Sequence, residues 1–327
     1  MNNKVYYHTA PYKIEAVNDI LTLPTEKYVT LEYLYCGICG GDYSTYIGRR
    51  NDFPYSLGHE FVGRVTNIGD DVSTLHIGDY VISDFNYRCG KCSNCISGNS
   101  HLCLQNDAHK FSNRAFSQYG NIHESYLYKI PSFSFLPKAC LIEPLSCVIH
   151  ACNLCKLNKD MSIVINGCGS IGMLFIFYLS KILSYENIYI NEINKMREKN
   201  IIKYFPVKVY DPDMIDKYDY IIECSNSTNG IKKSLDLCSF GGHICIMSHL
   251  YGINTSFIYE NICKKELVPI FPLRNGNIDT IKLAINYIGK FWDDGAKELL
   301  GIYDDIYLAF NKKNITSFNK QIVKIPH

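Results

Sequence analysis

The pattern of apolar and polar positions differs between the two halves of the chain. From about residue 28 to residue 84, short runs rich in β-branched and aromatic residues alternate with glycine and aspartate turns. Three such runs cover residues 28–35, 61–68 and 80–85. Several short strands at this spacing predict a small barrel-like β-domain.

From residue 162 the pattern becomes that of alternating buried strands and amphipathic helices. A buried strand at 162–166 precedes a helix at 170–183, and a strand at 187–191 precedes a helix at 195–204. This alternation predicts parallel βαβ units and therefore a doubly wound α/β domain. Further strands are expected at 207–210, 218–224, 243–247 and 321–325, with a helix at 279–288.

Residues 161–183 are apolar enough to be mistaken for a membrane span. Asn166 interrupts the segment, and three glycines break it between the expected strand and helix. A strand, a turn and a helix are therefore expected here, and no membrane association.

Length and charge narrow the class of protein. A chain of 327 residues suggests about two domains. Its 33 Lys and Arg residues nearly balance its 32 Asp and Glu residues. The sequence therefore has no broad basic field for a nucleic acid or an anionic membrane, and a small-molecule substrate is expected instead.

The chain has fifteen cysteines. Its first sixteen residues lack the continuous apolar core of a secretory leader. We therefore expect a cytoplasmic protein whose cysteines are metal ligands or core residues and not disulfides.

Four of these cysteines form a C-x2-C-x2-C-x7-C pattern: Cys89, Cys92, Cys95 and Cys103. Two-residue gaps let neighbouring thiolates turn toward one ion, so residues 89–103 predict a closed, structural zinc site on an excursion loop. Four unrelated thiols are the simpler alternative. A nucleic-acid-binding zinc knuckle is disfavoured, because only Lys91 and His101 are nearby.

A second metal site is predicted from two short motifs that contain Cys39, His59 and Glu60. A thiolate, an imidazole and a carboxylate suit Zn²⁺, and three protein ligands leave a position for substrate. Glu143 is a fourth or exchangeable candidate ligand. Each residue alone would more often be an ordinary core or surface residue, so the prediction rests on the combination.

Thiol redox chemistry is an alternative for the C-x-x-C pairs Cys36–Cys39 and Cys152–Cys155. Cys36 ends an apolar strand, and the second pair lies where a helix is expected. Both positions indicate packing more strongly than catalysis.

A G-x-G-x-x-G sequence connects the strand and helix at 162–183. Gly167 forms the tight turn, Gly169 admits a pyrophosphate, and Gly172 packs helix against strand. The phosphates would lie at the amino end of the helix, whose free amides favour negative charge. Ser170 and Ile171 complete this predicted cofactor loop.

An acidic residue at the end of the next strand indicates which cofactor binds. Glu192 follows Gly172 by about 20 residues, where a carboxylate holds the ribose hydroxyls and repels a 2′-phosphate. NAD(H) is therefore favoured over NADP(H). The nearby Lys195, Arg197 and Lys199 weaken that preference, and Arg197 is a further cofactor-binding candidate.

Together, these motifs and their order resemble the zinc-dependent medium-chain alcohol dehydrogenase family over nearly the whole chain. The sequences 142–146 (IEPLS) and 46–50 (YIGRR) are similar to its polyol branch, which includes sorbitol dehydrogenase and ribitol-5-phosphate dehydrogenase. The resemblance implies a GroES-like β-barrel catalytic domain at 1–145 and 272–327 and a Rossmann domain at 146–271. It also implies two zinc ions per chain and a homo-oligomer, either a dimer or a tetramer.

The same resemblance assigns roles to individual residues. Cys39 and His59, with Glu60 or Glu143, would hold the catalytic zinc, and Asp42 would orient the ligand histidine. Most members have Ser or Thr where this chain has Gly41, and that hydroxyl passes on the substrate proton. Ser44, Glu143 or water would have to replace it.

Three arginines suggest the substrate. Arg49 and Arg50 lie between the two halves of the metal site, and Arg274 matches a pocket arginine of polyol dehydrogenases. Because arginine binds phosphate through paired hydrogen bonds, a polyol phosphate or ketose phosphate is expected. The alternatives are an unphosphorylated polyol, another secondary alcohol such as threonine, and a noncatalytic cofactor-binding protein.

Overall fold

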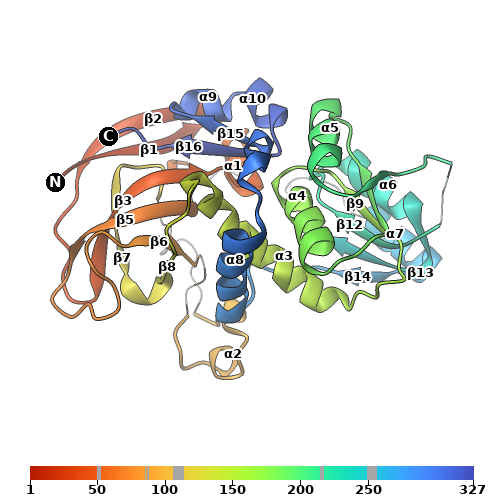
Figure 1. Cartoon of the computed structure of the whole chain (residues 1–327), viewed down its shortest axis with the longest axis horizontal. Coiled ribbons are helices and arrows are strands. Elements are labelled where there is room, and N and C mark those ends of the chain that lie inside the picture. Colours follow the sequence, from red (N-terminus) through yellow and green to blue (C-terminus); the bar gives the residue numbers. More distant parts are fainter. Residues whose placement is uncertain (50–52, 85, 87, 106–113, 214–216, 249–255) are drawn as a thin grey trace.

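Two large sheets organise the molecule, which we describe from a computed structural model (Figure 1). The description covers residues 1–49, 53–84, 86, 88–105, 114–213, 217–248 and 256–327. One sheet contains strands from both ends of the chain, and the other lies wholly between residues 163 and 270. A mixed α/β fold is therefore confirmed.

The first sheet has seven described strands in the order β15-β16-β3-β5-β6-β8, with β7 also paired to β3. All neighbours are antiparallel except β15 and β16, which are parallel. It belongs to the expected GroES-like domain. Its strands are β3 (Tyr28–Gly37), β5 (Glu60–Ile68), β6 (Tyr80–Ser83), β7 (Tyr119–His123), β8 (Leu127–Lys129), β15 (Leu300–Tyr303) and β16 (Lys320–Lys324).

The second sheet is parallel throughout its described strands, in the order β11-β10-β9-β12-β13-β14. This is the predicted Rossmann sheet. Its strands are β9 (Ile163–Asn166), β10 (Ile188–Asn191), β11 (Lys208–Val209), β12 (Tyr218–Glu223), β13 (Cys238–Ile246) and β14 (Val268–Ile270).

Helices cover both faces of this sheet, as its apolar strands predict. Along β9, Ile163 and Ile165 belong to one hydrophobic cluster, whereas Val164 belongs to another. The covering helices include α4 (Ser170–Phe177), α5 (Lys195–Tyr204), α6 (Thr228–Leu237) and α7 (Ser256–Lys265).

Two packed helices, α3 (Ile142–Cys155) and α8 (Ile278–Phe291), lie between the sheets (Figure 1). The stretch 136–155 is the one described helix long and apolar enough to cross a bilayer, but 78% of its most apolar window is buried inside the protein. It is therefore a core element by position. The domain boundaries at 145/146 and 271/272 remain predictions.

Several elements differ from expectation. The helix expected at 170–183 ends as a π-helical turn, Tyr178–Ile182, where the amide of Leu183 donates to the carbonyl of Tyr178. The cysteine loop contains the short helix α2 (Ser93–Ile96) and a 3₁₀ turn, Ser100–Leu102.

A three-stranded sheet near the amino terminus was not predicted, because its second strand is mostly exposed and polar. It consists of β1 (Asn2–Ala10), β2 (Lys13–Ile20) and β4 (Tyr55–Ser56). The remaining described α-helices are α1 (Gly40–Tyr46), α9 (Ile306–Phe310) and α10 (Lys312–Ser317).

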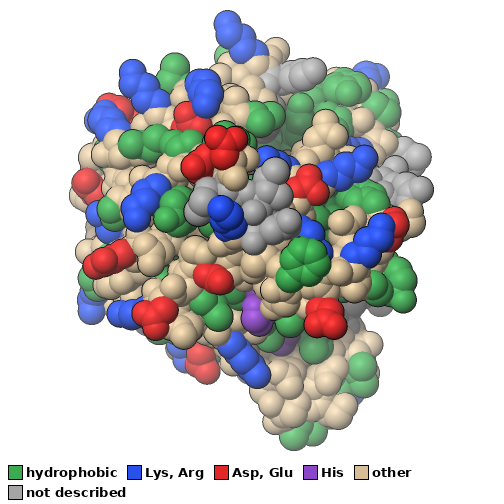
Figure 2. All heavy atoms as spheres, turned by 90° about the vertical axis from the view of Figure 1, so that its right-hand side faces the viewer, with side chains coloured by type: hydrophobic (Ala, Val, Ile, Leu, Met, Phe, Trp, Pro, Cys, Tyr) green, Lys and Arg blue, Asp and Glu red, His purple; other side chains and the backbone are tan. Residues whose placement is uncertain are grey.

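Charged side chains of both signs are interspersed on the face drawn in Figure 2, which is the Rossmann side of the molecule. This distribution agrees with the near-neutral composition and shows no single-sign field on that face.

Candidate metal centres and cofactor loop

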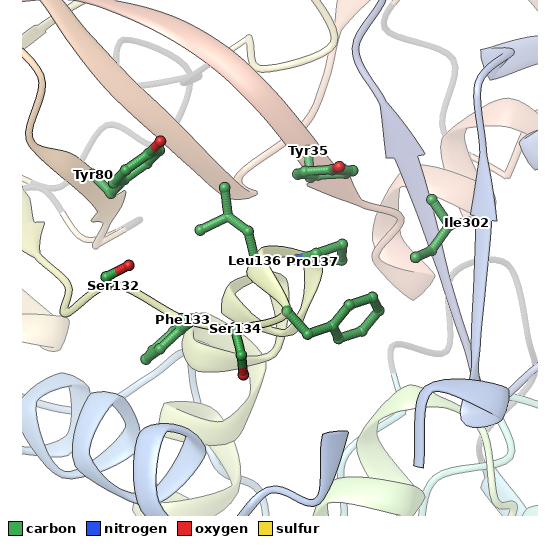
Figure 3. Close-up of a pocket in the computed structure, with 9 residues that line it drawn as sticks. Tyr35, Tyr80, Ser132, Phe133, Ser134, Leu136, Pro137 and Ile302 are labelled. Carbon is green, nitrogen blue, oxygen red and sulfur yellow. The ribbon is translucent and has the colours of Figure 1, made fainter. Parts of the chain in front are cut away.

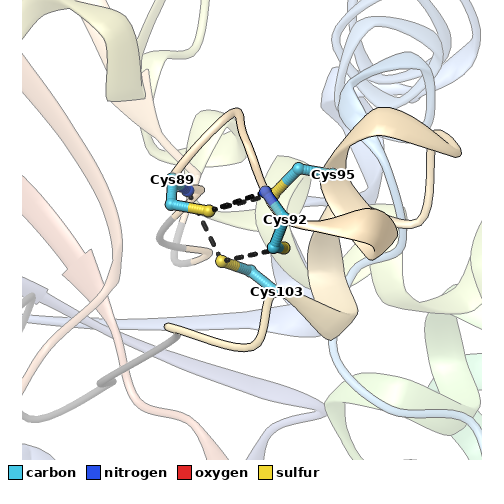
Figure 4. A group of neighbouring side chains, drawn as sticks. All are labelled: Cys89, Cys92, Cys95 and Cys103. Carbon is cyan, nitrogen blue, oxygen red and sulfur yellow. Dashed lines mark hydrogen bonds between the residues drawn. The ribbon is translucent and has the colours of Figure 1, made fainter.

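The four-cysteine cluster forms on a lobe that projects from the sheets (Figures 1 and 4). Two sulfur pairs, Cys89–Cys95 and Cys92–Cys103, are each separated by 3.9 Å. A tetrahedron with zinc–sulfur bonds of about 2.3 Å has edges of about 3.8 Å, so the spacing fits zinc. These side chains therefore suit one closed structural ion.

Backbone amides already favour thiolates in this cluster. The amide of Cys92 donates to the Sγ atom of Cys89 at 3.3 Å, and that of Cys89 donates to Cys103 at 3.4 Å. Amide hydrogen bonds from Leu104 and Cys95 lower the pKa of Cys92 to about 6. Burial raises the pKa of Cys95 to about 12, so metal binding there would release a proton.

The second cluster brings together the side chains of Cys39, His59 and Glu60. Their candidate ligand atoms lie within 4.8 Å of one another, although His59 is 20 residues from Cys39 in the sequence. Burial alone would lower the pKa of His59, but the Cys39 thiol and the Asp42 carboxylate hold it well above its usual value. A cation is therefore favoured at this position, and a thiolate, imidazole and carboxylate set suits zinc.

Helix α1 positions the first of these ligands. Cys39 is its N-cap, and the Sγ atom accepts a hydrogen bond from the Gly41 amide at 3.4 Å. Asp42 completes a capping box, because its Oδ2 atom accepts from the Cys39 amide at 2.9 Å. Asp42 thus has a described hydrogen bond to Cys39, and its charge also raises the pKa of His59.

Glu60 has a partner that the sequence did not reveal. Its Oε2 atom pairs with the Nζ atom of Lys320, a side chain with no solvent exposure. The sequence offered only a weak signal, a lysine two residues before the apolar pair Ile322 and Val323 in β16.

Glu143 lies in the first turn of α3, outside the group of three but close enough to His59 to affect its pKa. Burial raises the pKa of Glu143 itself to about 7, while the charge of His59 opposes that shift. The Cys147 thiol donates to Oε1 of Glu143 at 3.7 Å. Ser44, the other candidate proton carrier, is buried in α1.

The cofactor loop has the backbone that the glycine pattern predicts. Gly167 has φ +92°, and a Cβ there would lie 2.8 Å from the backbone of Ser225. A Cβ on Gly172 would collide with the carbonyl oxygen of Gly167. Helix α4 begins at Ser170, whose buried Oγ atom has no hydrogen-bond partner among the described residues. Such a helix start suits a phosphate.

Glu192 stabilises the backbone of this loop through two hydrogen bonds. Its two carboxylate oxygens accept from the amides of Cys168 at 2.7 Å and Asn194 at 2.8 Å. Arg197 donates to the carbonyl of Phe318 at 2.8 Å, and the adjacent Asn319 donates its side-chain amide to the carbonyl of Cys168 at 2.6 Å. Sequence reasoning missed Asn319, because the contact spans 151 residues.

The predicted substrate arginines are differently placed. Arg49 is exposed just after α1, and Arg50 lies outside the described residues. Arg274 donates to the carbonyl of His101, within the cysteine lobe, at 3.2 Å. The geometry thus places Arg274 against the structural lobe and gives it no described contact with Arg49.

A cavity of about 430 Å³ lies elsewhere on the molecule (Figure 3). Tyr35 and Tyr80 form one side, and residues 132–137 with Ile302 form the remainder. None of the predicted metal, cofactor or substrate residues lines it, so this cavity is separate from the candidate site.

Comparison with known proteins agrees with this arrangement. Residues 25–132 match the family model of the alcohol dehydrogenase GroES-like domain. The chain is 28% identical to sorbitol dehydrogenase from Halalkalibacterium halodurans over 75% of this chain and 76% of that protein. It is 25% identical to D-xylulose reductase A from Aspergillus oryzae, over 87% and 86% respectively.

Among solved structures, galactitol-1-phosphate dehydrogenase from Escherichia coli has the same fold, with a TM-score of 0.83. That match covers 99% of this chain and 100% of the other, at 18% identity. These matches support the resemblance to the zinc-dependent medium-chain alcohol dehydrogenases and to the polyol branch of that family.

Proposed function

We propose that this zinc- and nicotinamide-dependent dehydrogenase interconverts a polyol and the corresponding ketose. The observation that carries the proposal is the convergence of Cys39, His59 and Glu60, in a chain whose Rossmann sheet has a glycine turn suited to a phosphate. The relatives named for sorbitol and D-xylulose support this substrate class. The retained ligand set argues against a noncatalytic cofactor-binding protein.

Bound zinc would supply a Lewis acid for the substrate oxygen, and the nicotinamide would accept or donate the hydride. The chain's own residues have three tasks. Asp42 fixes the backbone of Cys39, Glu143 and Ser44 are candidates to carry the substrate proton, and the amino end of α4 binds the pyrophosphate.

For the cofactor, we propose a preference for NAD(H). Glu192 places a carboxylate at the end of β10, where it would repel a 2′-phosphate. The test is Glu192→Gln, compared with Glu198→Gln, which removes a nearby carboxylate that pairs with Lys195 in the following helix. We expect the ratio of NAD to NADP specificity to fall about tenfold only in the first variant. An unchanged ratio would contradict this assignment.

A phosphorylated polyol is the second candidate substrate, favoured by one specific observation. Arg49 is exposed immediately after α1, the helix that Cys39 caps, and has no described ion pair. Arg49→Ala should raise KM for a polyol phosphate about tenfold and leave KM for the free polyol unchanged. Arg64→Ala, which removes an exposed arginine paired with Glu32, is the matched control.

We also propose a cytoplasmic homo-oligomer. None of the fifteen cysteines is paired in a disulfide, and five of them are the candidate zinc ligands described above. Among the described strands, β14 is at the edge of its sheet, and apolar side chains are exposed on it (Val268) and just after it (Phe271 and Leu273). Light scattering should give a mass of two or four chains, and a monomer at micromolar concentration would contradict the proposal.

A further inference from the structure

Lys320 is completely buried, which is rare for a lysine. Its Nζ atom pairs with Oε2 of Glu60 and donates to the carbonyl of Ile38 at 3.0 Å. Burying an ammonium group is strongly unfavourable unless it is paired and hydrogen-bonded. One described contact of this ammonium group is therefore a candidate metal ligand, Glu60, and the other, Ile38, immediately precedes Cys39 in the chain.

The fold holds the lysine in place on both sides. Its backbone pairs with Leu300 in the sheet, and the neighbouring Asn319 is tied to the cofactor loop through the carbonyl of Cys168. The side chain passes over Gly37, where a Cβ would lie 2.7 Å from the Cε atom of Lys320. A larger residue at 37 would displace it, so the sequence provides space for this lysine.

The charges of the site explain why a cation is needed there. Cys39, Asp42, Glu60 and Glu143 place four acidic groups at or beside the site, whereas zinc contributes two positive charges. Lys320 adds one buried positive charge next to Glu60 and offsets part of this excess. Because the ammonium group contacts Oε2, the Oε1 atom of Glu60 remains available to a metal.

We propose that Lys320 is a positioning residue of the metal centre, which orients the Glu60 carboxylate. The inference rests on the proposed function, since it assumes that Cys39, His59 and Glu60 bind zinc. Under this proposal, Glu60 is the carboxylate ligand with a fixed orientation, and Glu143 is the exchangeable ligand. Outer partners of metal ligands commonly change metal affinity by about 10- to 100-fold.

The test compares Lys320→Met with Lys138→Met in the full-length protein. Lys138 is also nearly buried and is paired with Asp294 at 2.8 Å, but it has no described contact with a predicted ligand. Zinc affinity at the labile site is measured by chelator competition, and the site is then loaded with cobalt for its visible spectrum. We expect about 10- to 100-fold weaker zinc binding and an altered cobalt spectrum only in Lys320→Met. Wild-type affinity and spectrum in that variant would overturn the proposal.

A second comparison covers the case in which Lys320→Met does not fold. The double variant Glu60→Gln, Lys320→Met has no unpaired buried charge and is compared with Glu60→Gln alone. If Lys320 acts through Glu60, the two should bind zinc with equal affinity, and a further tenfold loss in the double variant would refute this. Failure of the proposed function would appear differently, as wild-type protein without a second, labile zinc or without turnover.

Discussion

A Cβ atom built on Gly41 would lie 3.8 Å from the Sγ atom of Cys39 and would meet no other atom within 4 Å outside its own helix backbone. The position where most family members carry a hydroxyl therefore has room for one. The packing around this Cβ position therefore does not explain the glycine.

Gly41→Ser should raise kcat about tenfold with little change in KM, because a positioned hydroxyl assists proton transfer. Steady-state kinetics with a polyol substrate checks this. Gly40→Ser is the matched control, since a Cβ at Gly40 meets nothing within 4 Å. An unchanged kcat for Gly41→Ser would show that another group, such as Glu143 or Ser44, already carries the proton efficiently.

Asn319→Ala should weaken NADH binding about tenfold, because the buried carbonyl of Cys168 in the cofactor loop loses its donor. Fluorescence titration of NADH measures the effect. The control is Asn314→Ala, which removes a comparable hydrogen bond from a side-chain amide to the carbonyl of Leu308 at 2.8 Å. This hydrogen bond does not involve the cofactor loop, so NADH binding should be unchanged. Equal affinities in both variants would exclude a role of Asn319 in loop geometry.

Cys39→Ser and Cys103→Ser should separate the two metal sites. The first should lower the zinc content from about two ions per chain to about one and abolish turnover, with Tm nearly unchanged. The second removes a buried ligand of the lobe and should lower Tm by about 4 °C or more. Metal analysis and calorimetry provide the measurements, and equal effects of both variants on Tm would contradict the division into structural and catalytic zinc.

His8 should make the protein sensitive to acid. Burial lowers the pKa of this histidine to about 4, and its ring packs 5.0 Å from that of Phe310. Between pH 6.5 and about 4 the unfolded chain binds a proton that the folded chain does not, so stability falls as pH is lowered through that window. The loss amounts to about 3 kcal/mol.

His8→Phe should therefore flatten the dependence of the unfolding free energy on pH between pH 6.5 and 4. Urea denaturation at several pH values gives the slope. The exposed His76 provides the control, and His76→Phe should leave the slope as it is in the wild type. The same slope in His8→Phe and wild type would show that other groups govern acid unfolding.

Local sequence patterns predicted much of the fold and of both metal clusters. The βαβ order, the helix Lys195–Tyr204 and the cysteine lobe follow from spacing within short segments. Lys320 and Asn319 could not be predicted, because they act on residues 260 and 151 positions away. Likewise, the sequence placed Arg274 at the substrate, whereas its described hydrogen bond is to the cysteine lobe.

The most direct test of the central claim follows nicotinamide absorbance with zinc-loaded protein, a panel of polyols, ketoses and their phosphates, and NAD(H) and NADP(H) in parallel. We predict turnover of a polyol or ketose, faster with NAD(H), that is lost when the labile zinc is chelated and restored when zinc is returned. If metal analysis shows that this zinc has been lost but turnover persists, the account is contradicted. The absence of turnover with every polyol and ketose in a protein that binds both zinc and cofactor would also contradict it.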